Sequence, residues 1–421
     1  MRLADTAGLR RSYRAFNAAL GSLYEDDLIS LSAGTPGPGF DDTAFFDAAG
    51  MVYGARGFDA SQLNTPEARR LIAETLKQLQ TAIASGVPHE VPETVRHALE
   101  NNAFVFSGFK AYHTLREVGL SLLDPDGSIK PFETFRRDVA KVNDRYNHNY
   151  LYAEYNHAVG ASIMASRWQQ IEKDGDRYDL QYRTAQDDRV REDHAILHGT
   201  TLPPSDPFWD HYLPPNGWNC RCTAVQVRKG KYPQSDPKLS MLRGKNCTEA
   251  ARQQIFRFNP GKDLKLFPPR HPYFKAPHDA KKVIGQMCEE QQREQRKAVV
   301  KDLKQWAKDN LTEVQVAKFP SKRLILANDN DKSRVVLNKT FFGECISKYK
   351  DDPLYITKLI VAKQVKELFK SARFIGSETS KNHPDSIFKI YETDHNGFRV
   401  QFKVKSNADA DILYIMRLFK T

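Results

Sequence analysis

The stretch YRTAQDDRVREDHAILHGTTLPPSDPFWDHYLPPNGWNCRC, residues 182–222, combines carboxylates, guanidinium groups, imidazoles and thiols within one short segment. Its first part, residues 184–197, predicts a short helix, because a threonine opens it and Gly199 follows it. On such a helix His194 and His198 are four residues apart and share one face. We therefore expect the polar side chains of this segment to form one site.

The second part of the stretch ends in two cysteines. Residues 200–219 contain five prolines, which predict an ordered loop rather than a helix or strand. Residues 223–227, Thr-Ala-Val-Gln-Val, then predict a strand. Cys220 and Cys222 lead into that strand and point the same way, because strand side chains alternate with period two. We expect both thiols to converge with His194 and to hold the loop.

A zinc ion is one chemistry that fits these side chains. Two thiolates and one imidazole are common zinc ligands, and here they would be Cys220 and Cys222 with His194 or His198. His211 is a further imidazole in the stretch. The spacing C-x-C differs from the C-x-x-C of common zinc knuckles.

Three other interpretations of the same residues stay open. Hydrogen bonds and packing alone would lock the loop if Asp188 paired with Arg191 or Arg221. A Cys–His pair would activate one thiol as a nucleophile. A disulfide between Cys220 and Cys222 is disfavoured, because extended C-x-C geometry directs both sulfur atoms in parallel.

This pattern resembles the signature of phage Mu F-like minor head proteins, also known as head morphogenesis proteins of tailed phages. The resemblance covers residues 95–228, and its most specific residues are Asp188, Arg191, His194, Gly199, Pro215, Cys220, Arg221 and Cys222. It implies a minor capsid protein that acts beside the portal, with portal, capsid or scaffold proteins as partners and phage DNA nearby. The implied location is the bacterial host cytoplasm during assembly, then the inside of the virion head.

Length and composition set broader limits. The chain has 421 residues and a formal net charge of +11. This length predicts two or three domains, and the positive charge favours acidic partners such as nucleic acid. Five scattered cysteines are not a secreted disulfide framework. Because the sequence has no long apolar run and no apolar signal-peptide core, we expect a cytoplasmic protein without membrane contact.

The predicted fold class is α+β with several domains. A mainly helical N-terminal half precedes a small α+β signature unit, and C-terminal helices pack on an antiparallel sheet. The predicted parts are an N-terminal arm (1–64), a head morphogenesis domain (65–258), a proline-rich boundary with a charged linker helix (259–311) and a C-terminal domain (312–421).

Individual elements follow from caps and periodicity. Thr65 and Pro66 predict the start of a helix, and residues 132–166 predict one long helix. Residues 168–183 predict one or two strands. Residues 259–280 contain five prolines and mark the clearest boundary.

The C-terminal region predicts two helices, at 340–350 and 353–372, followed by a sheet of three or four antiparallel strands. The strands are predicted at 386–393, 397–405 and 411–418, and the second has strict period-two alternation. A short strand is also expected at 335–337.

This order, with ETSKNHPDSIFKIYET, FRVQFKVKS and ILYIMRL, resembles the phage-associated barnase–EndoU–colicin–RelE-like nucleases. The resemblance implies RNA cleavage without metal, in which one group accepts the 2′-OH proton and another protonates the leaving oxygen. His383 suits the acid–base role, and Ser386 suits phosphate positioning. The remaining candidates are the phosphate-binding cations and the base-stacking or proton-donating tyrosines, which are Arg399, Lys403, Lys405, Tyr391 and Tyr414.

Two alternatives accompany this interpretation. The chain would be a polymorphic toxin if the head-like region served only to deliver an RNase. It would be a purely structural virion protein if the C-terminal domain were inactive, since alternating Lys and Arg also occur on any solvated sheet face.

Overall fold

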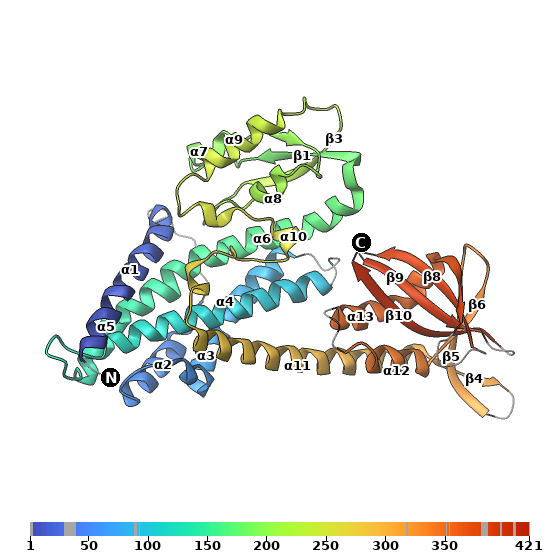
Figure 1. Ribbon diagram of the computed structural model, residues 1–421, viewed down its shortest axis with the longest axis horizontal. Helices are drawn as coiled ribbons and strands as arrows, with labels where there is room; N and C mark the ends of the chain where they lie inside the picture. The colour runs from blue at the N-terminus through green and yellow to red at the C-terminus, as the bar shows by residue number, and fades with distance from the viewer. Residues whose placement is uncertain are drawn as a thin grey trace. The chain divides into compact units, whose positions relative to one another are not determined.

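The computed structural model describes residues 3–28, 39–87, 91, 93–316, 319–350, 352, 354–379, 386–395, 398–406 and 410–420. The chain forms two compact units (Figure 1). Unit 1 comprises Met1–Val91 and Val95–Cys288, and unit 2 comprises Pro92–Thr94 and Glu289–Thr421. Within the described ranges, no helix is long and apolar enough to cross a membrane.

Long helices build most of unit 1. They are α1 (Leu3–Leu28), α2 (Asp42–Gly54), α3 (Pro66–Gly86), α4 (Glu93–Leu120), α5 (Phe132–Asn143) and α6 (Leu151–Asp174). As expected, Thr65 caps α3, because its side chain accepts a hydrogen bond from the amide of Ala68. The predicted long helix is also present, because a π-helical turn, Asp144–Tyr150, joins α5 to α6 without a break.

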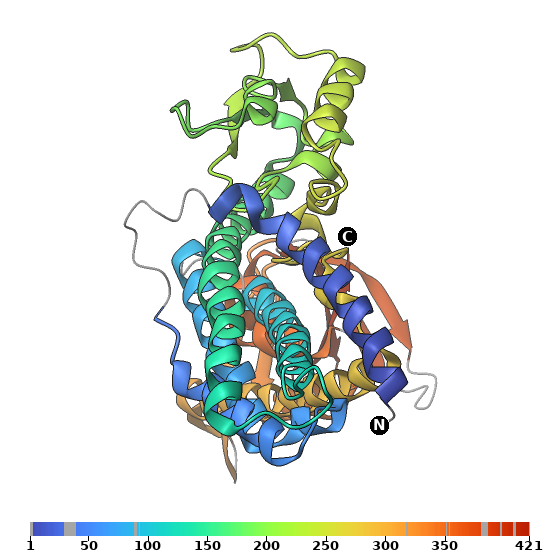
Figure 2. The same ribbon diagram turned by 90° about the vertical axis from the view of Figure 1, so that its left-hand side faces the viewer.

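The N-terminal residues belong to this helical core. Leu20, Tyr24 and Phe45 are buried in the same apolar cluster as the side chains of α3 to α6. Tyr24 stacks on Tyr150 with 4.0 Å between ring centroids, and α1 lies along the helices in both views (Figures 1 and 2). The predicted separate arm over 1–64 is therefore replaced by an integral part of unit 1.

A small α+β subdomain follows α6. Its antiparallel sheet has the order β2-β1-β3, and a second apolar cluster lies beneath it. The predicted strand region begins late, because the residues from Trp168 to Asp174 continue α6. The elements are β1 (Tyr178–Arg183), α7 (Glu192–Ala195), β2 (Thr201–Leu202), α8 (Phe208–Tyr212), β3 (Thr223–Arg228) and α9 (Pro237–Cys247).

The proline-rich segment after α9 is core rather than a boundary. Leu266, Phe267 and Tyr273 are fully buried in the helical cluster, and Phe267 stacks on Phe106 at 3.6 Å. The prolines exclude regular structure, but the aromatic residues between them fill the core. The short elements here are η5 (Gln254–Phe256), α10 (Pro260–Asp263) and η6 (Pro272–Phe274). The two units instead divide inside α11 (His278–Asn310), after Cys288.

Unit 2 contains a seven-stranded sheet of order β4-β5-β6-β10-β9-β8-β7. β6 and β10 are parallel, and the other neighbours are antiparallel. The sequence predicted a smaller, antiparallel sheet, because it missed the β4–β5 hairpin and the long-range β6–β10 pairing. The elements are β4 (Thr312–Val316), β5 (Phe319–Ala327), β6 (Arg334–Asn338), α12 (Lys339–Ser347), α13 (Tyr355–Val361), α14 (Val365–Ser371), β7 (Arg373–Thr379), β8 (Ile387–His395), β9 (Phe398–Lys405) and β10 (Ile412–Lys420).

The two faces of this sheet differ as the alternation in β9 predicted. Val400, Phe402 and Val404 are buried in the core of unit 2, whereas the residues between them are not. β7 forms one edge of the sheet and carries an irregularity between Phe374 and Gly376, where its register against β8 shifts.

Candidate functional site

Two thiols and one imidazole meet in the α+β subdomain. His194 is buried in α7, and its Nδ1 lies 3.6 Å from the Sγ of Cys220 and 3.6 Å from the Sγ of Cys222. Both cysteines are half-buried and free of disulfides. The three potential ligand atoms all lie within 4.8 Å of one another. The predicted convergence of these residues is therefore present.

The segment before α7 departs from the predicted helix over 184–197. Only Glu192–Ala195 is α-helical. The backbone at Gln186 has φ 56°, which a right-handed helix cannot contain. Thr184 is not a helix cap, because its amide and hydroxyl are hydrogen-bonded to Nδ1 of His198 at 3.2 and 2.9 Å. His198 therefore lies outside the thiol cluster, as does the exposed His211.

A bidentate ion pair fixes this loop against the end of the stretch. Asp187 accepts hydrogen bonds from both terminal nitrogens of Arg221, one at 2.6 Å. These bonds hold the pKa of Asp187 at about 2. The sequence assigned this pairing to Asp188, one residue away, because charge pattern alone does not distinguish adjacent carboxylates.

The loop of residues 213–219 joins the two cores of unit 1. Trp218 belongs to the helical cluster, where its ring stacks on Tyr24 at 4.9 Å. The carbonyl of Trp218 accepts a hydrogen bond of 2.8 Å from Arg191. Asn216 accepts one of 2.9 Å from the hydroxyl of Tyr182 in β1. Arg191 thus positions the loop directly.

The same loop contacts α6. Asn156 donates a hydrogen bond of 2.7 Å to Asn219. A side chain at Gly160 would stand 3.5 Å from the ring of the buried Pro215, so helix and loop are in close contact. The signature residues therefore connect the α+β subdomain to the helical core, and they also form a cluster of reactive groups.

The electrostatics of the cluster favour a charged pair. A hydrogen bond from Cys222, with the nearby imidazole of His194, lowers the pKa of Cys220. Burial opposes the charged form of His194, but the adjacent Cys220 thiolate outweighs burial and raises its pKa. The pKa of Cys222 is raised by its hydrogen bond to Cys220 and by burial. The charged forms of Cys220 and His194 therefore stabilise each other.

A third cysteine lies beside the cluster. Cys247, at the end of α9, is buried, and its Sγ lies within 4.8 Å of ligand atoms of His194 and Asp193. Burial raises the pKa of Cys247 to about 12. Sequence reasoning missed this residue, because it lies far along the chain from the other two thiols and carries no spacing signal.

In unit 2, several predicted site residues line one groove with a volume of about 1260 Å³. Four of its lining residues are cationic and one is acidic, and Tyr349, Phe388 and Tyr414 add aromatic surface. Sequence reasoning missed two of the cations, because Lys348 follows a helix and Arg417 sits in a mostly apolar strand. The polar lining residues are Lys348, Ser377, Glu378, Thr379, Ser386, Lys403, Lys405 and Arg417.

Two of the predicted catalytic residues, Tyr391 and Arg399, are placed differently. Tyr391 is buried on the core face of the sheet, where its hydroxyl donates to Asp331 at 2.9 Å, so it cannot stack a base in the groove. Arg399 is outside the groove lining and lies 3.9 Å from the carboxylate of Glu392. His383 lies outside the described residues. In the groove itself, Lys403 forms an ion pair with Glu378.

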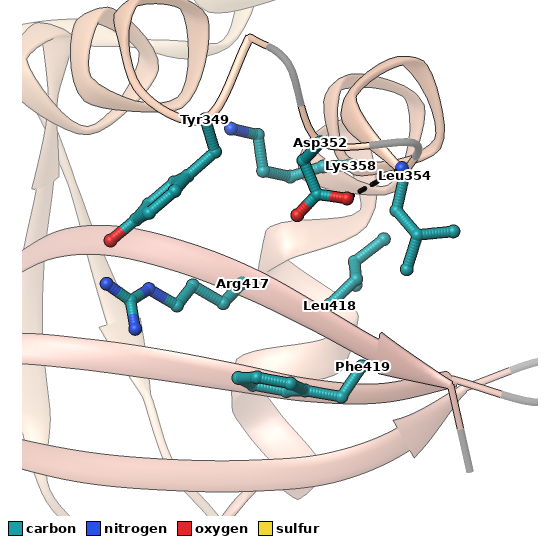
Figure 3. A pocket seen from close by; sticks show the side chains of 7 residues that line it. All are labelled: Tyr349, Asp352, Leu354, Lys358, Arg417, Leu418 and Phe419. Carbon is teal, nitrogen blue, oxygen red and sulfur yellow. Dashed lines mark hydrogen bonds between the residues drawn. The ribbon is translucent and has the colours of Figure 1, made fainter.

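A smaller pocket of about 150 Å³ adjoins the groove residues (Figure 3). The guanidinium of Arg417 lies over the ring of Tyr349, 4.5 Å from its centroid. Lys358 is buried behind that ring and donates a hydrogen bond of 2.7 Å to the carbonyl of Lys348. Burial lowers the pKa of both Arg417 and Lys358. These contacts fix the orientation of Arg417 at the groove.

Comparison with known proteins finds a family match over the region that contains the thiol cluster. Residues 130–225 match the family described as Phage Mu protein F like protein. Over 69 residues the chain is 41% identical to the putative capsid assembly protein F of Escherichia phage Mu. Over 80 residues it is 36% identical to the Mu-like prophage FluMu F protein of Haemophilus influenzae.

These alignments are short. They cover 16% and 17% of this chain, and the chain spans only 16% and 19% of the two relatives. No solved structure matches the chain. The Mu F-like prediction is confirmed for the region that contains His194, Cys220 and Cys222, and unit 2 lies outside the matched residues.

Proposed function

We propose that this chain is a minor capsid protein that acts in phage head morphogenesis at the portal. The observation that carries the proposal is the match of residues 130–225 to the Mu F-like family, supported by a relative named as a capsid assembly protein. The partners would be portal, capsid or scaffold proteins, and the location would be the host cytoplasm and then the virion head.

Exposed apolar side chains support a protein partner for the α+β subdomain. Leu239 and Leu242 of α9 are 45% and 54% exposed, and they lie three residues apart on one helix face. Ile196, directly after α7, is 43% exposed, and α7 packs on α9. Adjacent exposed apolar residues on a soluble domain are typical of interaction surfaces.

Co-purification with the portal and head proteins of the same phage tests this proposal. The full chain is expected to capture the portal protein, and Leu242→Glu is expected to reduce capture at least about tenfold, since about 1.4 kcal/mol of lost contact suffices. Ile325→Glu is the matched control, because Ile325 is 58% exposed on the sheet of unit 2. Capture of no virion protein, or equal loss with both variants, would refute the proposed surface.

A second candidate function belongs to unit 2. The groove combines four cations with aromatic side chains, the surface that single-stranded RNA requires for phosphate contact and base stacking. We propose an RNase-like domain whose groove binds RNA through Lys403, Lys405 and Arg417, with Tyr414 beside a base. The chain would then act as an effector or toxin delivered by a phage-like particle.

RNA cleavage by the purified chain without added metal tests this second function. Lys405→Ala is expected to weaken RNA binding, and Lys370→Ala is the control, because Lys370 is exposed outside the groove. His383→Ala is expected to lower the rate about 10²–10⁴-fold, the usual weight of one acid–base group. If the folded wild-type chain cleaves no RNA, unit 2 is an inactive interaction module.

A further inference from the structure

The distances at the thiol cluster match those of a metal centre. In a tetrahedral zinc site, bonds of about 2.3 Å to sulfur and 2.0–2.1 Å to nitrogen place those two atoms about 3.6 Å apart. The Nδ1 of His194 lies 3.6 Å from each of the Sγ atoms of Cys220 and Cys222. Both nitrogen–sulfur separations therefore already match those around one metal ion.

We propose that His194, Cys220 and Cys222 bind a single transition-metal ion, with zinc as the preferred metal. Thiolate and imidazole donors select zinc-like metals and exclude magnesium and calcium, which prefer oxygen. Nδ1 of His194 is the ligand atom, because it is the ring nitrogen that both thiols face. This site is independent of the proposed role at the portal.

A buried carboxylate next to His194 supports the same site. Asp193 Oδ2 accepts a hydrogen bond of 2.8 Å from Gln253, whereas Oδ1 is buried and lacks a hydrogen-bond partner among the described residues. A carboxylate oxygen of Asp193 lies within 4.8 Å of a ring nitrogen of His194. Metal-bound histidines commonly donate their second ring N–H to such a carboxylate, which sets the tautomer.

The arrangement fits metal binding better than the two competing chemistries. A disulfide would join the two sulfur atoms and would leave the imidazole without a role, and both cysteines are free. A nucleophilic pair requires one thiol, whereas here both thiols face one nitrogen atom at equal distance.

The fourth position is assigned to water. Cys247 approaches His194 from α9 as part of a second group, with Asp193, that contains neither Cys220 nor Cys222. The ion would link α7 to the entry to β3, which are the elements on both sides of the signature loop. A zinc site with three protein ligands keeps its fourth position for water.

Metal analysis of the full-length chain tests the proposal. After reconstitution with zinc and removal of free metal, the wild type is expected to retain about one ion per chain. Cys220→Ser, Cys222→Ser and His194→Ala are expected to lose it. Cys288→Ser is the matched control, because Cys288 is a half-buried cysteine on α11 outside the cluster, and it is expected to retain the ion. Asp193→Asn is expected to weaken zinc affinity about 10–100-fold.

A second measurement uses the wild type, so that the proposal can be tested even if the variants fail to fold. Zinc is expected to protect Cys220 and Cys222 from alkylation, and a chelator is expected to expose both thiols and lower the melting temperature. Cobalt substitution counts the bound thiolates, which are expected to be two, and Cys247→Ser is expected to leave that count unchanged. A wild-type chain that retains no metal, or a Cys220→Ser/Cys222→Ser double variant that retains it, overturns the site.

Discussion

A fully buried ion pair lies at the centre of unit 1. The ammonium group of Lys110 donates a hydrogen bond to Glu154, and the two side chains are 1% and 0% exposed. The hydroxyl of Tyr24 donates to the same carboxylate at 2.9 Å and lies 3.2 Å from Nε2 of His271. Burial lowers the pKa of Lys110 and raises that of Glu154, so each charge depends on its partner.

Removal of one charge from this pair is expected to destabilise unit 1 strongly. Glu154→Gln leaves the ammonium of Lys110 buried without a counter-charge, and we expect a loss of about 3–5 kcal/mol in the free energy of unfolding. Adding Lys110→Met to the Glu154→Gln variant should recover much of the lost free energy of unfolding. Glu294→Gln is the control, because its pair with Lys297 is exposed and is worth about 0–1 kcal/mol. Urea denaturation measures all three, and equal midpoints for the two single variants would contradict this account.

Buried histidines give unit 1 a pH dependence in a defined window. Burial lowers the pKa of His113 and of His157 to about 4, against an ordinary value of about 6.5. Between these values the unfolded chain binds more protons, so stability is full above about pH 6.5 and falls as the pH drops toward 4. Each lowering of a histidine pKa by one corresponds to about 1.4 kcal/mol in the free energy of unfolding.

Urea midpoints at pH 7.5, 6 and 5 measure this slope. His157→Gln should make the slope shallower, because the variant loses one of the two histidines that titrate in that range and keeps His113. Exposed carboxylates such as Asp187, with a pKa of about 2, contribute only at lower pH. A midpoint that does not change between pH 7.5 and 5 would show that these histidines are protonated without penalty.

At the level of elements, the sequence was most informative where local signals and burial agree. The cap and proline at the start of α3 and the alternation in β9 were predicted correctly. Local sequence signals were insufficient where residues far apart in the chain determine the structure, as in the parallel pairing of β6 with β10. The helix predicted before α7 was wrong for the same reason. Asp187 pairs with Arg221, 34 residues later, instead of supporting a helix.

The candidate site residues also differ in whether local sequence signals could predict their positions. Cys220, Cys222 and His194 could be predicted to meet, because period-two alternation places both thiols on one side of the chain. Cys247 could not, because only the packing of α9 on α7 brings it there. Tyr391 was misplaced because a tyrosine in a strand gives no sign of which face is buried, and here its partner Phe402 lies in the core.

The contact of α10 with α6 provides a test of the revised domain boundary. A side chain at Gly261 would lie 2.1 Å from Cβ of the buried Trp168. We expect Gly261→Ala to destabilise unit 1 by about 1–3 kcal/mol, because overpacking forces the helix and the loop apart. At Gly50, within α2, a side chain meets nothing within 4 Å, so Gly50→Ala is a control expected to be neutral or slightly stabilising. If thermal denaturation finds the two variants equally stable, the proline-rich segment is not part of the core.

For the whole molecule, the division after Cys288 predicts unfolding in two steps. Each unit has its own buried core, so the two need not lose structure together. The sequence placed the division near the prolines, because composition marks irregular backbone and does not reveal whether that backbone is buried.

The tryptophans allow the two steps to be observed separately. Trp168, Trp209 and Trp218 lie in unit 1, whereas Trp306 lies in unit 2, 5.6 Å from the ring of Phe342. Trp306→Phe should remove one transition from the fluorescence signal and leave both in the far-ultraviolet circular dichroism. A single transition that coincides in both signals would mean that the units unfold as one.

The edge of the sheet in unit 2 has a consequence at high protein concentration. Phe374 and Ile375 of β7 are 48% and 54% exposed, and an edge strand with such side chains is normally a template for pairing with another chain. The register shift at this point, with Gly376 at φ 150°, interrupts the row of backbone donors and acceptors that a second strand would need. Pairing of β7 with an edge strand of a second copy is therefore disfavoured.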